Sequence, residues 1–182
     1  MSNNPTPETS ESTPYFQSNI CSIEEYDKNI ILSISQLLEE RIKKNKRKKF
    51  KVLKDNFFTE MIPKITIYDY LIRIVKYTRI NIPTLILSVT SITSFMRKTK
   101  NFLSYFNIFK LLITSCFINA KFHEDYTFSS KLYAKVGGIS YKELNLLELE
   151  FYKKSEYSLY VSDDTYNNYL KFFQNKANKI RI

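Results

Sequence analysis

Apolar residues recur at intervals of three and four along most of the chain, which is the pattern of amphipathic helices. The clearest example places Leu144, Leu147 and Phe151 at i, i+3 and i+7. The β-branched stretch after Pro83 also has helical spacing, and the strict alternation typical of strands is absent from it. The spacing therefore predicts an all-α chain. Its expected helices cover residues 22–42, a segment that opens at Thr66, a segment that opens at Pro83, residues 105–123, a short segment that ends at Gly137, residues 140–155 and residues 163–178.

Residues typical of helix ends stand between two of these segments. Gly137 and Gly138 are the only glycines in the chain, and glycine tolerates the left-handed turn that often ends a helix. Ser140 and Glu143 have the spacing of a capping box, in which each side chain accepts a hydrogen bond from the other residue's amide. One helix is thus expected to end at the glycine pair and the next to begin at Ser140.

Length and composition predict one domain, over residues 22–178, in a reducing compartment. A chain of 182 residues can bury a core of its own, and Cys21 and Cys116 lie too far apart in unlike contexts to suggest a disulfide. Residues 1–21 are polar and predict a disordered tail with no secretion signal. The longest apolar stretch, residues 80–96, is interrupted by polar residues, so no membrane span is expected. We therefore expect an intracellular protein of the nucleus, the cytoplasm or both.

Most of the positive charge lies in one short stretch. The chain carries a formal net charge of +10, and the cations from Arg41 to Lys51 dominate it. The stretch ends the first helix and enters an expected basic connection over residues 43–62. It is interpreted as a nuclear localisation signal, as a patch that contacts an anionic partner or as a solvated connection beside a helix end. The candidate localisation signal consists of Lys46, Arg47, Lys48 and Lys49.

The residues needed for common enzyme chemistry are sparse. His123 is the single histidine, and with two separated cysteines it cannot build a His/Cys metal site or a Cys–His nucleophile pair. Two adjacent glycines cannot form a phosphate-binding glycine-rich loop. The sequence therefore predicts a protein that is not an enzyme and that needs no cofactor or small-molecule substrate.

Two charged residues stand on apolar helix stripes. Glu148 falls on the stripe of Leu144, and Lys121 lies four residues after Phe117, on the same side of its helix. A buried carboxylate is costly unless it is paired or hydrogen-bonded. A structural salt bridge and a binding hot spot that offers both charges to a partner are equally compatible with this spacing.

The stretch from Lys64 to Tyr169 resembles the cyclin box of the P/U type, the short cyclins with a single box. The segments that carry the resemblance are Tyr70–Tyr77, Ala120-Lys121-Phe122, and Tyr133–Ser140 with its continuation Glu143-Leu144-Asn145 and Leu147-Glu148. The resemblance implies a single five-helix box, over about residues 64–160, between an N-terminal helix at 22–42 and a C-terminal helix at 163–178.

The resemblance also implies a function and a site. In cyclins, a lysine and a glutamate at the positions of Lys121 and Glu148 clasp a cyclin-dependent protein kinase near its αC helix. Phe122, Leu146 and Phe151 are expected to complete that contact as exposed apolar groups. The resemblance thus implies a regulatory subunit that forms a heterodimer with the kinase and holds αC in the active position. The N-terminal helix is a candidate second contact.

Two alternatives come from other classes of protein. Cyclin-like boxes also occur in transcription factors, so a nucleic-acid-binding protein is one alternative. The confinement of the basic residues to one stretch argues against nucleic acid as a partner. A scaffold that binds a non-kinase partner is the other. The chain also departs from many cyclins, because the substrate-docking Met-Arg-x-x-Leu motif is not kept at residues 63–67 and its acidic partner is replaced by Thr93.

Overall fold

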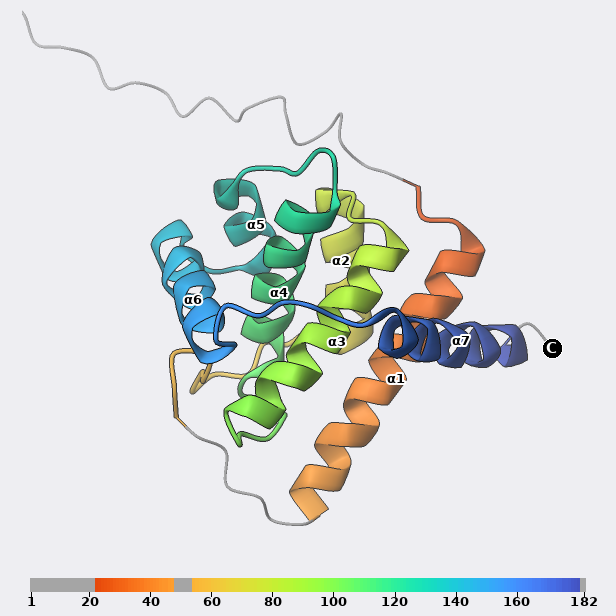
Figure 1. Cartoon of the computed structure of the whole chain (residues 1–182), viewed down its shortest axis with the longest axis horizontal. Coiled ribbons are helices and arrows are strands. Elements are labelled where there is room, and N and C mark those ends of the chain that lie inside the picture. Colours follow the sequence, from red (N-terminus) through yellow and green to blue (C-terminus); the bar gives the residue numbers. More distant parts are fainter. Residues whose placement is uncertain (1–21, 48–53, 181–182) are drawn as a thin grey trace, which may run out of the picture.

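The computed structural model describes residues 22–47 and 54–180, and over these residues it contains seven helices and no strand (Figure 1). The all-α prediction is confirmed. The helices are α1 (Glu25–Arg47), α2 (Ile67–Thr78), α3 (Ile82–Lys98), α4 (Ile108–His123), α5 (Ser130–Gly137), α6 (Tyr141–Lys154) and α7 (Asp163–Ile180). The predicted disordered tail, Lys48 and Lys49 lie outside the described residues.

Helix α4 is the centre of the fold. Every residue from Ile108 to Ala120 except Lys110 is buried, and α2, α3, α5 and α6 all pack against this helix (Figure 1). Its contact with α3 is close because serines face each other. The Ser115 hydroxyl donates to the Ser88 carbonyl at 2.8 Å, which satisfies a polar group in the apolar interior. The small serine side chains thus allow α3 and α4 to approach closely.

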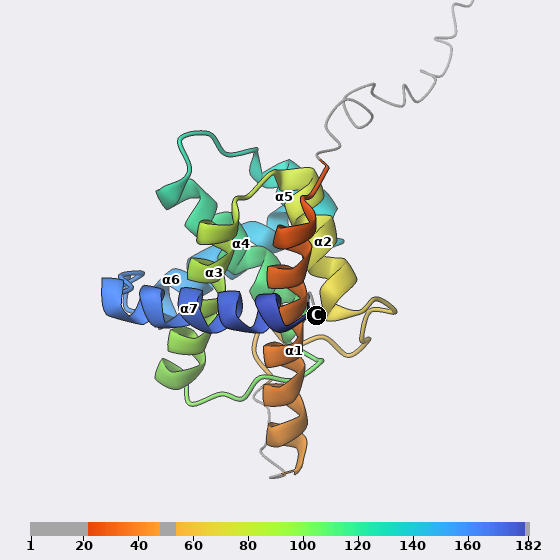
Figure 2. The ribbon, with the colours of Figure 1, turned by 90° about the vertical axis from the view of Figure 1, so that its right-hand side faces the viewer.

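Helices α1 and α7 cross each other on the outside of this bundle (Figure 2). Phe173 and Ala177 of α7 are buried, and the α1 guanidinium of Arg41 donates to the Tyr169 hydroxyl at 3.1 Å. Helix α1 runs five residues beyond its predicted end at Ile42, because the basic residues after Ile42 suit the negative end of a helix. The first part of the basic run is therefore helical.

The predicted helix ends are largely confirmed. The side chains of Thr66 and Ser140 accept hydrogen bonds from the Asp69 and Glu143 amides. The Glu143 carboxylate pairs with Lys110 at 2.8 Å, a contact that the expected capping box does not include. Helix α4 begins three residues later than predicted.

The residues before α4 form a turn stabilised by Asn107. Its side-chain oxygen accepts from the Ser104 amide, and its side-chain nitrogen donates to the Phe102 carbonyl at 3.0 Å. These bonds fix the chain around residues 102–107 in a non-helical path. Local side-chain bonds of this kind compete with a helix ladder, and periodicity does not reveal them.

The two glycines do different things. Gly138 has φ +71° and ends α5 in the left-handed turn, whereas Gly137 lies where an added Cβ would stand 2.7 Å from Cγ1 of the fully buried Ile113. Gly137→Ala is expected to lower the free energy of unfolding by about 2 kcal/mol, since Ile113 has no room to yield. Gly138→Ala is expected to lower it by about 1 kcal/mol, the strain of a left-handed residue.

Urea denaturation of both variants and of the native protein measures this difference. The sequence alone assigns the pair a single role at a helix end. Equal losses for the two variants, or a larger loss for Gly138→Ala, would contradict the close approach of α5 to α4.

Candidate functional site

Lys121 and Glu148 meet at the edge shared by α4 and α6. The Lys121 ammonium lies 2.5 Å from Oε1 of Glu148. The Glu148 side chain is 15% exposed and that of Lys121 is 42% exposed, so the acid is seated in the fold and the base reaches toward solvent. The structure therefore brings together the two charged residues that the sequence singled out.

The local sequence explains this geometry. Lys121 lies in the last turn of α4, where a cation is favourable, and its ammonium lies 5.0 Å from the centroid of the Phe117 ring. On α6, the buried Leu144, Leu147 and Phe151 fix the face turned to the core. Glu148 adjoins that face, so its carboxylate emerges at the boundary between core and solvent.

An aromatic pair stands beside the two charges. Phe122 is 61% exposed, and its ring meets the Tyr152 ring edge-on at 6.2 Å between centroids. Burial and the nearby charge of Glu148 raise the pKa of Tyr152 to about 12. Like any tyrosine it is neutral at ordinary pH, so it offers an O–H donor. The sequence analysis missed Tyr152. The signal was present, because residues four apart on a helix are neighbours and Tyr152 follows Glu148 by four.

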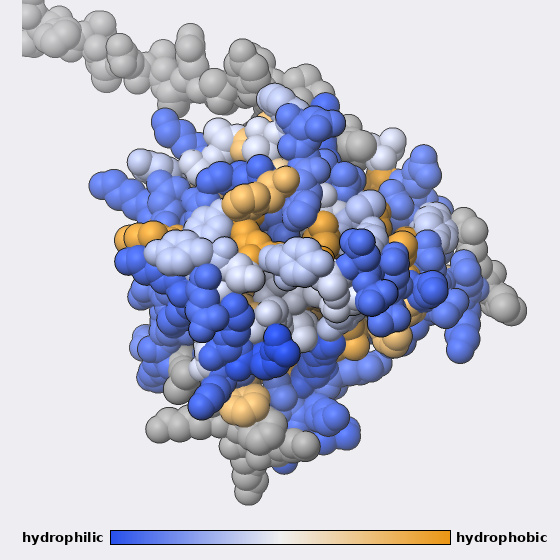
Figure 3. Space-filling view, in the orientation of Figure 1, coloured by the Kyte–Doolittle hydropathy of each residue, from blue (hydrophilic) through white to orange (hydrophobic). Residues whose placement is uncertain are grey.

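Leu146 is exposed as predicted, at 63%, but it lies away from the charges. Two residues along a helix turn the side chain by about 200°, so Leu146 points to the side of α6 opposite Glu148. Leu149 is 47% exposed and lies about 100° from Glu148. Leu149 is therefore nearer to the charged pair than Leu146. Figure 3 shows apolar surface over α4 and over the outer edge of α6, among hydrophilic residues.

The expectation that Phe151 is an exposed contact residue is wrong. Its side chain is 0% exposed and its ring stacks on Phe95 at 4.5 Å between centroids, with Phe57 edge-on at 6.2 Å. Phe151 is the third member of the buried stripe that its own spacing defines. Lys121, Phe122, Glu148, Leu149 and Tyr152 lie at the outer side of α4 and α6, and we call this set of residues the α4–α6 surface.

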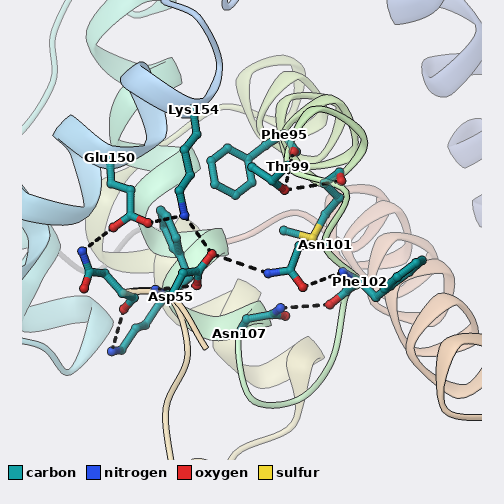
Figure 4. Close-up of polar contacts among 12 residues, drawn as sticks. Asp55, Phe95, Thr99, Asn101, Phe102, Asn107, Glu150 and Lys154 are labelled. Carbon is teal, nitrogen blue, oxygen red and sulfur yellow. Dashed lines mark hydrogen bonds and ion pairs between the residues drawn. The ribbon is translucent and has the colours of Figure 1, made fainter. Parts of the chain in front are cut away.

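The other edge of α6 is tied down by a second charged cluster (Figure 4). Lys154 lies 3.1 Å from an oxygen of Asp55 and 2.5 Å from one of Glu150, and the Asn101 amide lies 3.5 Å from Asp55. Burial lowers the pKa of Lys154, but hydrogen bonds to Glu150 and Asp55 raise it more, so the net shift is upward. The cluster links α6 to the segment before α2 and to the turn after α3, which holds α6 in place.

The α4–α6 surface has the chemistry of recognition. The Lys121 ammonium has three donors and the Glu148 carboxylate several acceptor positions, so each retains hydrogen-bonding capacity beyond their mutual contact. Within residues 22–47 and 54–180, no group of three His, Cys, Asp or Glu side chains lies together as metal ligands would. None of the described helices combines the length and apolar character that crossing a bilayer requires.

Comparison with known proteins identifies the family. The sequence profile of the Cyclin family matches residues 3–159. Cyclin-U4-3 of Arabidopsis thaliana is 33% identical over 147 residues, which are 80% of this chain and 67% of that protein. Cyclin-P3-1 of Oryza sativa subsp. japonica is 30% identical over 149 residues, covering 80% of this chain and 63% of that protein.

A third relative comes from yeast. PHO85 cyclin-7 of Saccharomyces cerevisiae is 34% identical over 128 residues, covering 62% of this chain and 44% of that protein. The chain thus spans about two thirds or less of the length of these relatives. The helix α7 begins beyond the matched residues 3–159. The profile match, which covers most of the sequence, and the likeness to U-type and P-type relatives show that this chain belongs to the cyclin family and is a P/U-type cyclin.

Proposed function

We propose that this cyclin holds the αC helix of a cyclin-dependent protein kinase in the active position through its α4–α6 surface. The family makes the chain a regulatory subunit of such a kinase. An active kinase needs its αC glutamate paired with the β3 lysine that orients the ATP phosphates. A cyclin that binds this arrangement better than the inactive one shifts the population of the kinase toward activity. Catalysis then belongs to the kinase, and this chain performs none.

The observation that carries the proposal is the partly exposed Lys121–Glu148 pair. The Glu148 carboxylate is mostly buried and so held in place, whereas the Lys121 side chain is 42% exposed and open to a partner. Lys121 is suited to donate to backbone carbonyls and Glu148 to accept from amides, as at the end of a helix. Exposed Phe122 and Leu149 flank the pair and supply apolar contact around it.

The experiment is a kinase pull-down with the full-length chain from the cells in which it occurs. Lys121→Ala/Glu148→Ala is expected to lose the kinase and its histone-directed activity, because truncating an interface hot spot weakens binding by about 30-fold or more. The variant is expected to stay folded, since a partly exposed ion pair contributes about 1 kcal/mol or less to stability.

Glu143→Ala is the matched control. Glu143 pairs with Lys110 at 2.8 Å, and this pair also joins α4 to α6, but it lies at the other edge of α6 from Glu148. The control therefore removes an equivalent ion pair without touching the α4–α6 surface, and full kinase recovery is expected. Equal recovery from the double variant and the native chain would refute the assigned surface and favour α1. Failure of the native chain to recover any kinase would favour the scaffold or nucleic-acid-binding alternatives.

The nuclear localisation signal stays a prediction. Lys46 and Arg47 are exposed at the end of α1, which leaves them open to a carrier protein. Intracellular placement, in the nucleus, the cytoplasm or both, follows from the proposed kinase partner.

A further inference from the structure

A pocket of about 450 Å³ lies between the C-terminal halves of α1 and α3 and the connection that leads to α4. Figures 1 and 2 both show the C-terminal ends of α1 and α3 at the same end of the molecule, and Figure 2 shows the connection after α3 passing across to α1. The volume falls in the range of ligand-binding pockets, about 300–1,000 Å³. None of the residues that line this pocket belongs to the α4–α6 surface.

The walls of this pocket are cationic. Four of its lining residues are basic, and among the described residues that line it none is acidic; the basic ones are Arg41, Lys44, Arg97 and Lys100. The last three make no ion pair with the part of the chain that the structure describes. Arg41 donates to the Thr93 hydroxyl at 2.7 Å and to the Tyr169 hydroxyl, which are both neutral oxygens. The positive charge of the pocket is thus uncompensated by lining groups.

Nearby carboxylates are already paired elsewhere. Glu39 pairs with Lys43 at 3.6 Å and Glu40 with Lys176 at 3.4 Å. Asp55, whose carboxylate lies 3.5 Å from the side-chain amide of the pocket residue Asn101, pairs with Lys154 (Figure 4). These pairs neutralise the acids around the pocket and leave its own cations available.

The floor of the pocket is apolar. Leu38 and Ile92 are each 1% exposed and Leu103 is 6% exposed, and Met96 and Phe102 complete the lining. A preference for cations at helix C-termini explains basic residues at the ends of α1 and α3. It does not explain why four of them surround one apolar hollow without a carboxylate.

The pocket continues along α3. Arg97 and Thr93 also line an adjoining pocket of about 410 Å³ that reaches Tyr160 and Ser162 before α7. Two hollows that share a cation suit an extended peptide better than a small anion.

We propose that this pocket, the α1–α3 pocket, docks a phosphorylated peptide segment of proteins that the bound kinase modifies. The phosphate carries a charge of about −1.5 to −2 and three acceptor oxygens. Arg97 can bind two of these oxygens with its planar guanidinium while Lys44 and Lys100 add point charges. An apolar side chain next to the phosphorylated residue would fill the floor. This inference rests on the proposed function, because the bound kinase is the source of the phosphate. A substrate that has been phosphorylated once is then held for a second phosphorylation.

The test uses the full-length chain without kinase and a fluorescent pool of nonamer peptides. Each peptide has a central phosphothreonine and mixed flanking residues, and a second pool has unmodified threonine at that position. We expect the phosphorylated pool to bind at least about tenfold more tightly, the effect of one charge-assisted hydrogen bond, and the bound peptides to be enriched in apolar residues beside the phosphothreonine.

Arg97→Ala/Lys100→Ala is expected to abolish the preference for phosphorylated peptides. Lys131→Ala/Lys179→Ala is the control of equal charge, because both residues are exposed and neither lines the pocket. Equal binding of the two pools, an equal loss in both variants, or tighter binding of duplex DNA than of phosphopeptide at 150 mM salt would overturn the proposal. The Arg97→Ala/Lys100→Ala chain is expected to recover kinase normally, so failure of the docking pocket is distinguishable from failure of the α4–α6 surface.

Discussion

Replacing Phe151 with alanine is expected to lower the free energy of unfolding by about 4 kcal/mol. The ring is 0% exposed, stacks on Phe95 and meets Phe57 edge-on, so its removal leaves a cavity that three helices and a connecting segment cannot easily close. For a domain of this size the midpoint of thermal unfolding should fall by about 8–16 °C. Urea denaturation and calorimetry of the purified chain measure both quantities.

Phe122→Ala separates packing from binding. Phe122 is 61% exposed and contacts Tyr152 at the surface, so its loss should change stability by about 1 kcal/mol or less while weakening kinase recovery. Phe151→Ala should reduce kinase recovery only in proportion to the unfolded fraction. A Phe151→Ala chain that unfolds like the native protein but fails to recover kinase would contradict its place in the core.

The stability of this protein is expected to fall steeply above pH 10 because of two buried tyrosines. Burial raises the pKa of Tyr133 to about 12, and burial raises that of Tyr70 still further. In the unfolded chain both hydroxyls ionise near pH 10. Their folded pKa values lie above the unfolded value, so the stability that depends on them is present below pH 10 and is lost as the pH rises toward 12. These two tyrosines contribute a slope of about 2.7 kcal/mol per pH unit, and Cys116 and Tyr152, whose pKa values are also raised to about 12, make the decline steeper.

Urea denaturation at pH 8.5, 10.5 and 11.0 tests this slope. Tyr70→Phe/Tyr133→Phe should start from a lower stability, since the Tyr70 hydroxyl donates to the Gly137 carbonyl at 3.1 Å, but its decline with pH should be shallower. Tyr126→Phe/Tyr160→Phe is the control, because these rings are 75% and 84% exposed. Equal slopes in all three proteins would show that other groups govern unfolding in base.

The helices could be predicted from the sequence because their signals are local. Apolar spacing, the Thr66 and Ser140 caps and the glycine at the end of α5 each act within one or two turns, and the structure keeps them all. The start of α4 was missed by three residues because the Asn107 side chain binds the Phe102 carbonyl and the Ser104 amide, which holds the preceding residues in a turn. The end of α1 was missed because its last residues are stabilised by the favourable interaction of basic side chains with the helix C-terminus, and apolar spacing does not reveal this effect.

The site was predictable where charge conflicted with spacing. The sequence places Lys121 and Glu148 as charged residues on apolar helix stripes, and in the structure their side chains form an ion pair at 2.5 Å. Phe151 was assigned to the surface although its own spacing placed it in the core. The α1–α3 pocket was not predictable, because Arg41 and Arg97 lie 56 residues apart and only the packing of α1 on α3 brings their charges to one hollow.

The crossing of α1 and α7 has a consequence for how the chain acquires its structure. The contact between Arg41 and Tyr169 spans 128 residues, so the first helix lacks part of its partner until the last has been synthesised. Ribosomes add about 5–20 residues per second, which leaves α1 incompletely packed for several seconds while α2 to α6 emerge. Contacts of such long range also slow refolding. Nascent chains of this cyclin should therefore expose the apolar face of α1 to chaperones and proteases until α7 docks across it.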